Sequence, residues 1–360
     1  MDRCLWVRDL GTKREIRFCI FCDDIIMSAP DPATLDHFDR ELEERWGDCK
    51  CGTPKFLLGC DFHQNKGHVH LSVKTKVDAL LEQLNMQECQ LKDTPLAPGS
   101  TVDASEQPET PIKMPFRSVL GQISYMMLSC RPDLAFACSQ LARVQGHPTT
   151  KHWKMLMHVV KYLRNTRDHG VSYGPGDHDR NVLHAYADAS WADIPGSVTA
   201  PDARKSTLGH ILFLNGGPIE WKSKVSTMMA LSSAEAEIFS TVACGKSIAH
   251  HRRLLSVMGR PQGPTPTVLH DDSTSAIAFN NSRTSASRLR HLELKWLYCR
   301  QLVQEGLVKM EWADTNYMLA GPLTKALPVF KHKFFLPFLV RSSTEFVTRA
   351  TQYPFWRSTK

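Results

Sequence analysis

Three acidic residues in the second half of the sequence stand where carboxylates could meet around a metal ion. Asp188 closes an apolar segment that begins at Val182, Asp272 follows a shorter apolar segment, and Glu237 lies early in a long segment with helical spacing. Enzymes that cut or join phosphodiester bonds hold two Mg²⁺ ions about 4 Å apart between such carboxylates. Each acid alone is equally typical of a turn or of a solvated helix face. Their common setting makes them candidate catalytic residues and metal ligands.

A second pair of acids, Asp23 and Asp24, lies in the middle of residues 16–29, between two short apolar stretches. Ile, Phe and Cys favour strands, so the pattern predicts a hairpin with the acids at its turn. Asp31 and Pro32 then supply an N-cap and a first-turn proline for an amphipathic helix. A paired acid on a hairpin is weak evidence of chemistry by itself.

The elements that must position these acids follow from the spacing of apolar residues. The first half shows patterns of two hairpins and several helices, interrupted by a stretch rich in Pro, Ser, Thr and acids that predicts a linker. From Val182 the patterns change to short strands, one long helix, and then alternating helices and strands. This order predicts an α/β (α+β) fold with a mixed sheet and helices against its faces. We predict five segments, which are residues 1–96, 97–114, 115–176, 177–328 and 329–360.

Composition limits the class of protein. The chain of 360 residues suggests about two domains, and its formal net charge of +7 suits a polyanionic partner without deciding it. The eleven cysteines are scattered, which is typical of reduced thiols, and the strand spacing of Cys19 and Cys22 disfavours a zinc site. Neither a run of about 18 apolar residues nor a signal peptide is visible. We expect an intracellular protein that is neither secreted nor bound to a membrane.

Four stretches of the second half resemble successive blocks of one known domain. They read AYADASWAD, RKSTLGHILFLNGGPIEWKSK, ALSSAEAE and LHDDSTSAIAF. Together they are similar to the ribonuclease H domain of the Pol polyproteins of copia-type LTR retrotransposons. The resemblance spans about residues 182–327 and implies a ribonuclease H-like mixed five-stranded sheet with flanking helices.

The resemblance also assigns roles to individual residues. It implies three carboxylate ligands for Mg²⁺, or alternatively Mn²⁺, which are Asp188, Glu237 and Asp272. It favours Asp272 over Asp271 as the third ligand, and it gives His291 a part in proton or product movement. Glu235 takes the place of Glu237 if the register differs by two residues, because helix positions two apart point to nearly opposite sides.

The closing block departs from the family pattern. Where the family carries Leu-Ala-Asp before a Leu-Thr-Lys block, this chain has Gly321, which has no side chain to bind a metal. The second histidine of an earlier block is replaced by Leu297, and Asp314 is a weak candidate for the missing acid. The sequence therefore leaves open whether the domain is an active enzyme.

The first part of the chain resembles the end of the reverse transcriptase of the same elements. Phe21-Cys22-Asp23-Asp24 is similar to the Tyr-Val-Asp-Asp hairpin of the palm. Three further stretches are similar to neighbouring blocks of these elements, namely residues 56–59, 116–121 and 130–136. The resemblance implies a truncated palm and thumb over residues 1–96 and a helical connection over 115–176. Because too little chain precedes Phe21 for the fingers and the earlier palm acid, we expect no DNA synthesis by this chain alone.

These features support a leading hypothesis and two alternatives. The leading hypothesis is Mg²⁺-dependent hydrolysis of the RNA strand of RNA·DNA hybrids, with phosphates held through Arg204, Lys205, Ser206 and Thr207. The resemblance adds other Pol or Gag products of the element as partners, and a cytoplasmic virus-like particle or the nucleus as the location. One alternative is a decayed or co-opted fragment that binds nucleic acid without cutting it. The other is a fragment that completes a polymerase in trans.

Overall fold

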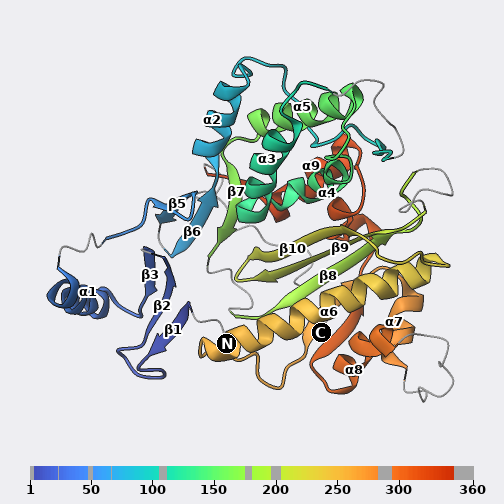
Figure 1. Ribbon diagram of the computed structural model, residues 1–360. Coiled ribbons are helices and arrows are strands. Elements are labelled where there is room, and N and C mark those ends of the chain that lie inside the picture. The colour runs from blue at the N-terminus through green and yellow to red at the C-terminus, as the bar shows by residue number, and fades with distance from the viewer. Residues whose placement is uncertain are drawn as a thin grey trace.

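In the part of the chain that the structure describes, helices combine with three sheets, which confirms the predicted α/β class (Figure 1). The computed structural model describes residues 4–22, 24–47, 52–65, 67–104, 112–174, 181–195, 204–282 and 294–343. In this part of the chain, no helix is both long and apolar enough to cross a membrane.

The N-terminal unit is a three-stranded antiparallel sheet with one helix beside it. Its strands β1 (Leu5–Arg8), β2 (Ile16–Phe21) and β3 (Asp24–Ser28) lie in that order. The predicted hairpin is confirmed, because β2 pairs with β3. Helix α1 (Pro32–Trp46) begins as predicted after Asp31, whose carboxylate accepts the Thr34 N–H at 2.9 Å. None of its side chains is buried, so this unit has little core of its own.

A second sheet collects strands from distant parts of the chain. Its order is β13 (Arg341–Ser342), β7 (His169–Tyr173), β6 (His68–Ser72), β5 (Cys60–Asn65) and β4 (Phe56–Leu57), with antiparallel neighbours. The helices packed with this sheet are α2 (Lys74–Gln83), α3 (Phe116–Cys130), α4 (Ala135–Ala142) and α5 (Thr150–Asn165). Segments that the sequence patterns separate, including residues 341–342 of the C-terminal extension, thus share one sheet.

The third sheet is mixed and carries the predicted acids. Its order is β10 (Gly217–Val225), β9 (Thr207–Leu214), β8 (His184–Ser190), β11 (Thr267–Asp271) and β12 (Val308–Trp312). The pairs β10·β9 and β9·β8 are antiparallel, whereas β8·β11 and β11·β12 are parallel. One face is covered by α6 (Ser233–Val257), α7 (Thr274–Asn281) and α8 (Tyr298–Gln304) (Figure 1).

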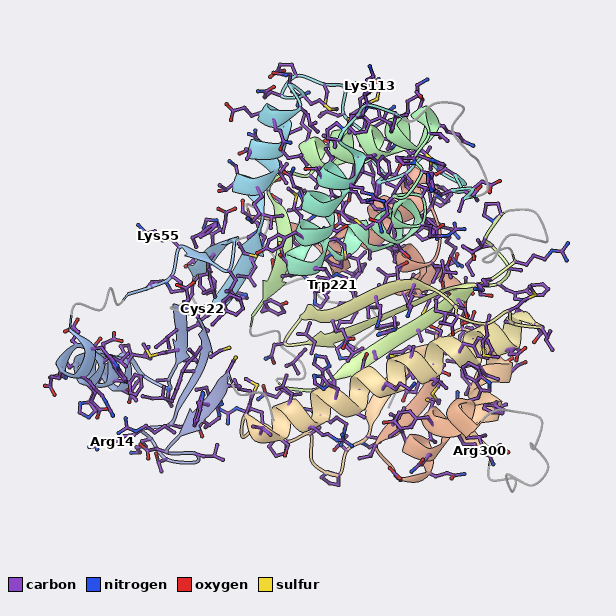
Figure 2. All side chains as sticks on the ribbon, in the orientation of Figure 1. Arg14, Cys22, Lys55, Lys113, Trp221 and Arg300 are labelled. Atoms are coloured by element: carbon purple, nitrogen blue, oxygen red, sulfur yellow. The ribbon has the colours of Figure 1, made fainter. Side chains whose placement is uncertain are left out.

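The two faces of this sheet follow from strand alternation. Ala185 and Ala187 pack with α6, whereas Tyr186 between them faces the opposite core, which contains Phe335 of α9 (Val329–Leu339). Trp221 on β10 joins the third sheet to the helices above it, because its indole N–H donates to the Met127 carbonyl of α3 at 3.0 Å (Figure 2).

A fully buried ion pair fastens α9 to the helices of the second sheet. Arg131 donates to both oxygens of Asp133 at 2.9 and 2.7 Å, and neither side chain is exposed. The Tyr162 hydroxyl donates to Asp133 at 2.7 Å and lies 3.0 Å from Nε2 of His332. Burial would raise the pKa of Asp133, but the adjacent Arg131 guanidinium holds it below its usual value. The Arg-Pro-Asp block noted in the sequence therefore has a structural role.

Candidate metal centre

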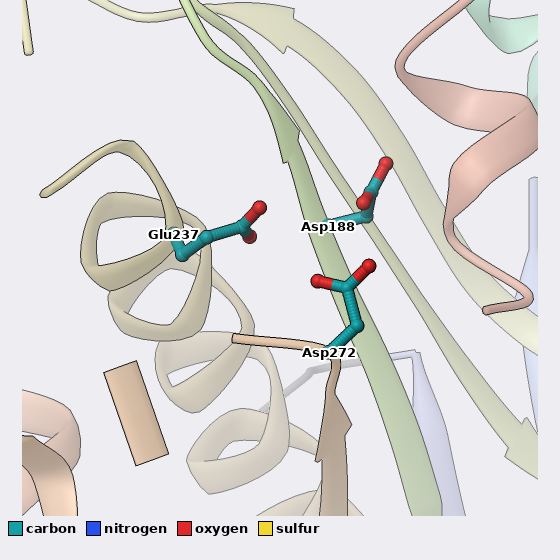
Figure 3. Close-up of side chains that lie close together, drawn as sticks. All are labelled: Asp188, Glu237 and Asp272. Carbon is teal, nitrogen blue, oxygen red and sulfur yellow. The ribbon is translucent and has the colours of Figure 1, made fainter. Parts of the chain in front are cut away.

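Three carboxylates converge at one edge of the third sheet. Asp188 belongs to β8, Asp272 directly follows β11, and Glu237 extends from the start of α6. One ligand oxygen from each lies within 4.8 Å of those of the other two. Figure 3 shows the three side chains turned toward a common space. The structure thus brings together the three acids chosen from the sequence as candidate ligands.

Strand register explains how two of these acids meet. The parallel strands β8 and β11 pair Leu269 with Ala185 and His270 with Tyr186. Continuing that register by two places brings Asp272 level with Asp188. The Thr315 hydroxyl donates to Asp272 Oδ2 at 2.7 Å and so fixes the direction of this half-buried carboxylate.

Helix capping explains why Glu237 rather than Glu235 reaches the cluster. The helix α6 begins after Ser232, whose hydroxyl accepts the Glu235 N–H at 3.2 Å. The Glu235 carboxylate turns back and accepts the Leu231 N–H at 2.6 Å. Glu235 is therefore engaged in the cap, and Glu237 lies on the side of the helix that faces the sheet.

Asp271 lies beneath the cluster and not in it. It is fully buried, and its Oδ1 accepts the Ser273 N–H at 2.7 Å. Burial, with the charges of Asp272 and Asp188 as smaller causes, raises the pKa of Asp271 to about 8. This buried acid is therefore mostly protonated at neutral pH, and burial keeps it from joining the three converging carboxylates as a fourth charge.

Burial and neighbouring charges strongly perturb Glu237. Its side chain is 8% exposed, and its Oε2 has no hydrogen-bond partner in the described part of the chain. Burial first, and then the charges of Asp188, Asp271 and Asp272, raise its pKa to about 10. A hard divalent cation would offset this repulsion, and carboxylate oxygens are the ligands that Mg²⁺ and Mn²⁺ prefer. The donor set therefore fits such an ion.

Asp188 is held by three contacts that the sequence did not indicate. The Thr324 hydroxyl donates to its Oδ2, and the Lys325 Nζ lies 3.5 Å from the same oxygen. The Ser240 hydroxyl donates to the Asp188 carbonyl at 2.9 Å, which fixes the strand under α6. The only available signal was the Leu-Thr-Lys block, since nothing local links Thr324 to a residue 136 positions earlier.

Gly321 begins the short 3₁₀ helix Gly321–Leu323 that precedes these two residues. A Cβ added there would meet one described atom group within 4 Å, the Lys325 Cε at 3.7 Å. The turn therefore presents a hydroxyl and an ammonium group to Asp188, where the family pattern led us to look for a fourth carboxylate.

The other predicted residues are placed differently. Asp23 and His291 lie outside the described residues, and Asp24 is exposed at the start of β3. Arg204 is exposed and Lys205 is half-buried. Ser206 and Thr207, however, are fully buried.

The hydroxyls of Ser206 and Thr207 brace the turn after β8. Thr207 Oγ1 donates to Asp193 at 2.9 Å, and the Ser206 hydroxyl accepts the Ala192 N–H at 3.2 Å. The structure therefore does not present these two hydroxyls to a phosphate.

Known proteins are similar to most of this chain. A family model described as reverse transcriptase (RNA-dependent DNA polymerase) matches residues 1–98. The retrovirus-related Pol polyprotein from transposon TNT 1-94 of Nicotiana tabacum is 27% identical over 341 residues, which cover 92% of this chain and 25% of that protein. The corresponding polyprotein from transposon RE2 of Arabidopsis thaliana is 29% identical over 326 residues, which cover 91% and 22%. Over most of its length the chain is thus similar to the Pol polyproteins of such transposons.

The chain spans about a quarter of the length of the curated relatives it matches. The reverse transcriptase match includes the N-terminal unit and strands β4, β5 and β6. The three converging carboxylates lie beyond it, in a part of the chain that the longer relatives also match. Asp23 and Asp24 therefore lie within the reverse transcriptase match, and the three carboxylates lie outside it.

Proposed function

We propose that residues 177–328 form a ribonuclease H-like domain that hydrolyses the RNA strand of RNA·DNA hybrids with Mg²⁺, or with Mn²⁺ in its place. The observation that carries the proposal is the convergence of Asp188, Glu237 and Asp272 around an unpartnered, buried Glu237 oxygen. The sheet order, with three antiparallel and then two parallel strands, supports the same assignment. An acidic cluster without a cation would be costly to bury, so the geometry favours a metal-dependent reaction.

The chemistry follows from the donor set. A divalent cation at these carboxylates would polarise a phosphate and lower the pKa of a water molecule. In the reaction, the oxygen of water bonds to phosphorus, one P–O bond of the RNA strand breaks, and a proton passes to the leaving oxygen. The role of the chain is to hold the carboxylates in place, which Thr324 does for Asp188 and Thr315 does for Asp272.

Contacts with the nucleic acid are assigned to basic side chains near the same sheet. Arg204 is exposed, and Lys222 and Lys224 are exposed at alternate positions of β10, so the two lysines lie on one side of that strand. Such groups bind phosphate by charge and give salt-dependent affinity with little sequence preference. A Pol fragment of this kind would act inside the cell, with nucleic acid and other Pol or Gag products as partners.

The proposal is tested by cleavage of a labelled RNA·DNA hybrid in Mg²⁺ and in Mn²⁺, with RNA·RNA and DNA·DNA duplexes as competing substrates. We expect cutting of the RNA strand of the hybrid alone. Asp188→Asn should reduce the rate by roughly 10³-fold, because it removes one charge of the cluster. The matched control is Asp24→Asn, which changes an exposed acid in the N-terminal unit and should leave the rate within about twofold.

A second candidate function is favoured by Gly321, which stands where the family pattern has an acid. Under this alternative the domain is a decayed or co-opted fragment that binds nucleic acid without cutting it. Gel-shift and cleavage assays on the same hybrid separate the two functions. Binding that weakens with salt, together with no cutting in either ion, would replace the nuclease with this alternative.

A further inference from the structure

We propose that the ammonium group of Lys325 supplies the second positive charge of the site, so that the cluster takes one divalent cation instead of two. The inference rests on the proposed function of the three carboxylates. Phosphodiester hydrolysis at such clusters commonly uses two cations, one near the attacking oxygen and one near the leaving oxygen. In this chain, a fixed cation already stands at one side of the cluster, since Lys325 Nζ lies 3.5 Å from Asp188 Oδ2.

The contacts of Asp188 divide its surroundings into two sides. Its Oδ2 accepts a hydrogen bond from the Thr324 hydroxyl and lies near the Lys325 ammonium. The same carboxylate also lies close to those of Glu237 and Asp272. Asp188 is only 2% exposed, so its charge is poorly screened by water. An ammonium at this distance therefore repels a second divalent ion from the Oδ2 side.

Lys325 is also placed to meet a substrate. Its side chain is 42% exposed, so the group that contacts the buried Asp188 also reaches solvent. A phosphate approaching the cluster would find the ammonium beside it. Lys325 would then offset negative charge on the phosphate as the bond breaks. In enzymes that bind two metal ions, the second ion does this.

Gly321 completes the case, because it leaves Lys325 without a competing acid on its own turn. A Cβ at Gly321 would lie 3.7 Å from the Lys325 Cε, so a carboxylate on that Cβ would be in reach of the ammonium. With glycine there, the ammonium pairs with Asp188 instead. The absence of an acid at position 321 therefore leaves the Lys325 ammonium to act at Asp188.

The turn that carries Lys325 is packed tightly against the sheet. Leu323 and Thr324 are fully buried, and Gly209 of β9, the register partner of Asp188, lies directly against them. The ammonium is therefore attached to a fixed backbone, which is what a charge that replaces a metal ion requires.

The test counts Mn²⁺ ions by electron paramagnetic resonance on the full chain, and measures hybrid cleavage on the same samples. The wild type should bind one Mn²⁺. Lys325→Met should bind that ion roughly tenfold more tightly, because a nearby positive charge is gone. It should nevertheless cut roughly 10²-fold more slowly, because a charge near the phosphate is gone as well.

Three further variants complete the experiment. Lys325→Met combined with Gly321→Asp should bind two spin-coupled Mn²⁺ ions and regain cleavage. Lys325→Arg keeps the charge and should bind one ion and retain cleavage. Lys333→Met is the matched control, since Lys333 pairs with Asp93 at 3.0 Å on the exposed side of α9 and should change neither measurement.

The outcomes separate this inference from the proposed function. Two ions in the wild type, or an unchanged Mn²⁺ affinity in Lys325→Met, would overturn the role of Lys325 and leave the nuclease assignment intact. Faster cleavage by Lys325→Met would also overturn it, since the lysine would then be an inhibitory occupant. No Mn²⁺ binding in any variant would instead overturn the metal site itself, and this inference with it.

Discussion

The N-terminal unit and the third sheet both carry acids next to apolar strands, but they place them in opposite environments. Asp24 is exposed on a small sheet beside α1, a helix with no buried side chain. Asp188 and Glu237 are 2% and 8% exposed and meet a third acid from another strand. Among the described residues, these three acids form the group that lies close enough together to share a metal ion. The two regions thus have similar patterns of strands and acids in the sequence. They differ in whether the acids are buried and lie close together.

Ion pairs show the same contrast between the two regions. Arg8 and Glu41 in the N-terminal unit approach to 2.6 Å, yet their side chains are 47% and 36% exposed. Arg131 and Asp133 approach to 2.7 Å with no exposure. The two ion pairs therefore differ in electrostatic interaction energy despite their nearly equal distances. Water screens the first pair and is excluded from the second.

The largest expected effect compares two glutamates on one helix. Glu237→Gln should lower the rate of hybrid cleavage by roughly 10³-fold or more, because it removes a buried ligand charge. Glu235→Gln should leave the rate within about twofold, because that carboxylate accepts the Leu231 N–H instead of joining the cluster. Initial rates in Mg²⁺ measure both. Equal losses in the two variants would show that burial does not separate functional from structural acids here.

The next largest effect compares the two ion pairs. Arg131→Ala should lower the free energy of unfolding by about 3–5 kcal/mol, since it leaves the buried Asp133 charge without its partner. Arg8→Ala should lower it by about 0–1 kcal/mol, because the pair with Glu41 is exposed. Urea unfolding followed by circular dichroism gives both values. A loss from Arg8→Ala as large as that from Arg131→Ala would contradict the contrast between the regions.

Local patterns predicted much of this structure and missed what distant segments contribute. The strand that carries Asp188, the hairpin before α1 and the cap at Asp31 all follow from neighbouring residues, and the structure contains them, although the strand continues past Asp188 to Ser190. The contacts of Thr324 and Lys325 with Asp188 do not, because they depend on how a later turn packs on the sheet. Burial of Ser206 and Thr207 was missed for the same reason.

A third prediction uses pH to compare the acids in metal-free protein. Glu237 and Asp271 have folded-state pKa values raised from 4.5 and 3.8 to about 10 and about 8. The folded chain therefore binds protons more tightly than the unfolded chain. Stability is lost as pH rises from the unfolded pKa values of 3.8 and 4.5 toward the folded values of about 8 and about 10. In EDTA, we expect the free energy of unfolding to be roughly 2 kcal/mol lower at pH 8 than at pH 7, because each raised group contributes up to about 1.4 kcal/mol per pH unit and the buried histidines are neutral throughout this range.

Two controls connect this pH effect to the cluster. Mg²⁺ in excess should reduce the slope, because a bound cation favours the ionised carboxylates. Glu237→Gln should reduce it even in EDTA, whereas Asp24→Asn should not. A slope that is unchanged by Mg²⁺ and by Glu237→Gln would place the titrating groups elsewhere in the protein.

The smallest effect concerns how the packing of β9 positions the turn at Asp188. A Cβ at Gly209 would lie 2.7 Å from the Thr324 Cγ2 and 3.0 Å from the Leu323 Cβ. Gly209→Ala should therefore push this turn away from the sheet and lower the free energy of unfolding by about 1–2 kcal/mol. Because the same shift moves Lys325 away from Asp188, Mn²⁺ should bind more tightly than in the wild type, although no site residue has changed.

A second substitution distinguishes this steric effect from a general loss of stability. Thr324→Ser removes the methyl group that the new Cβ would meet and keeps the hydroxyl that donates to Asp188. In the Gly209→Ala background it should restore part of the lost stability and return the Mn²⁺ affinity toward the wild-type value. If Thr324→Ser lowers stability further in that background, relieving the overlap has no benefit. The contact between Gly209 and Thr324 then does not set the position of Lys325.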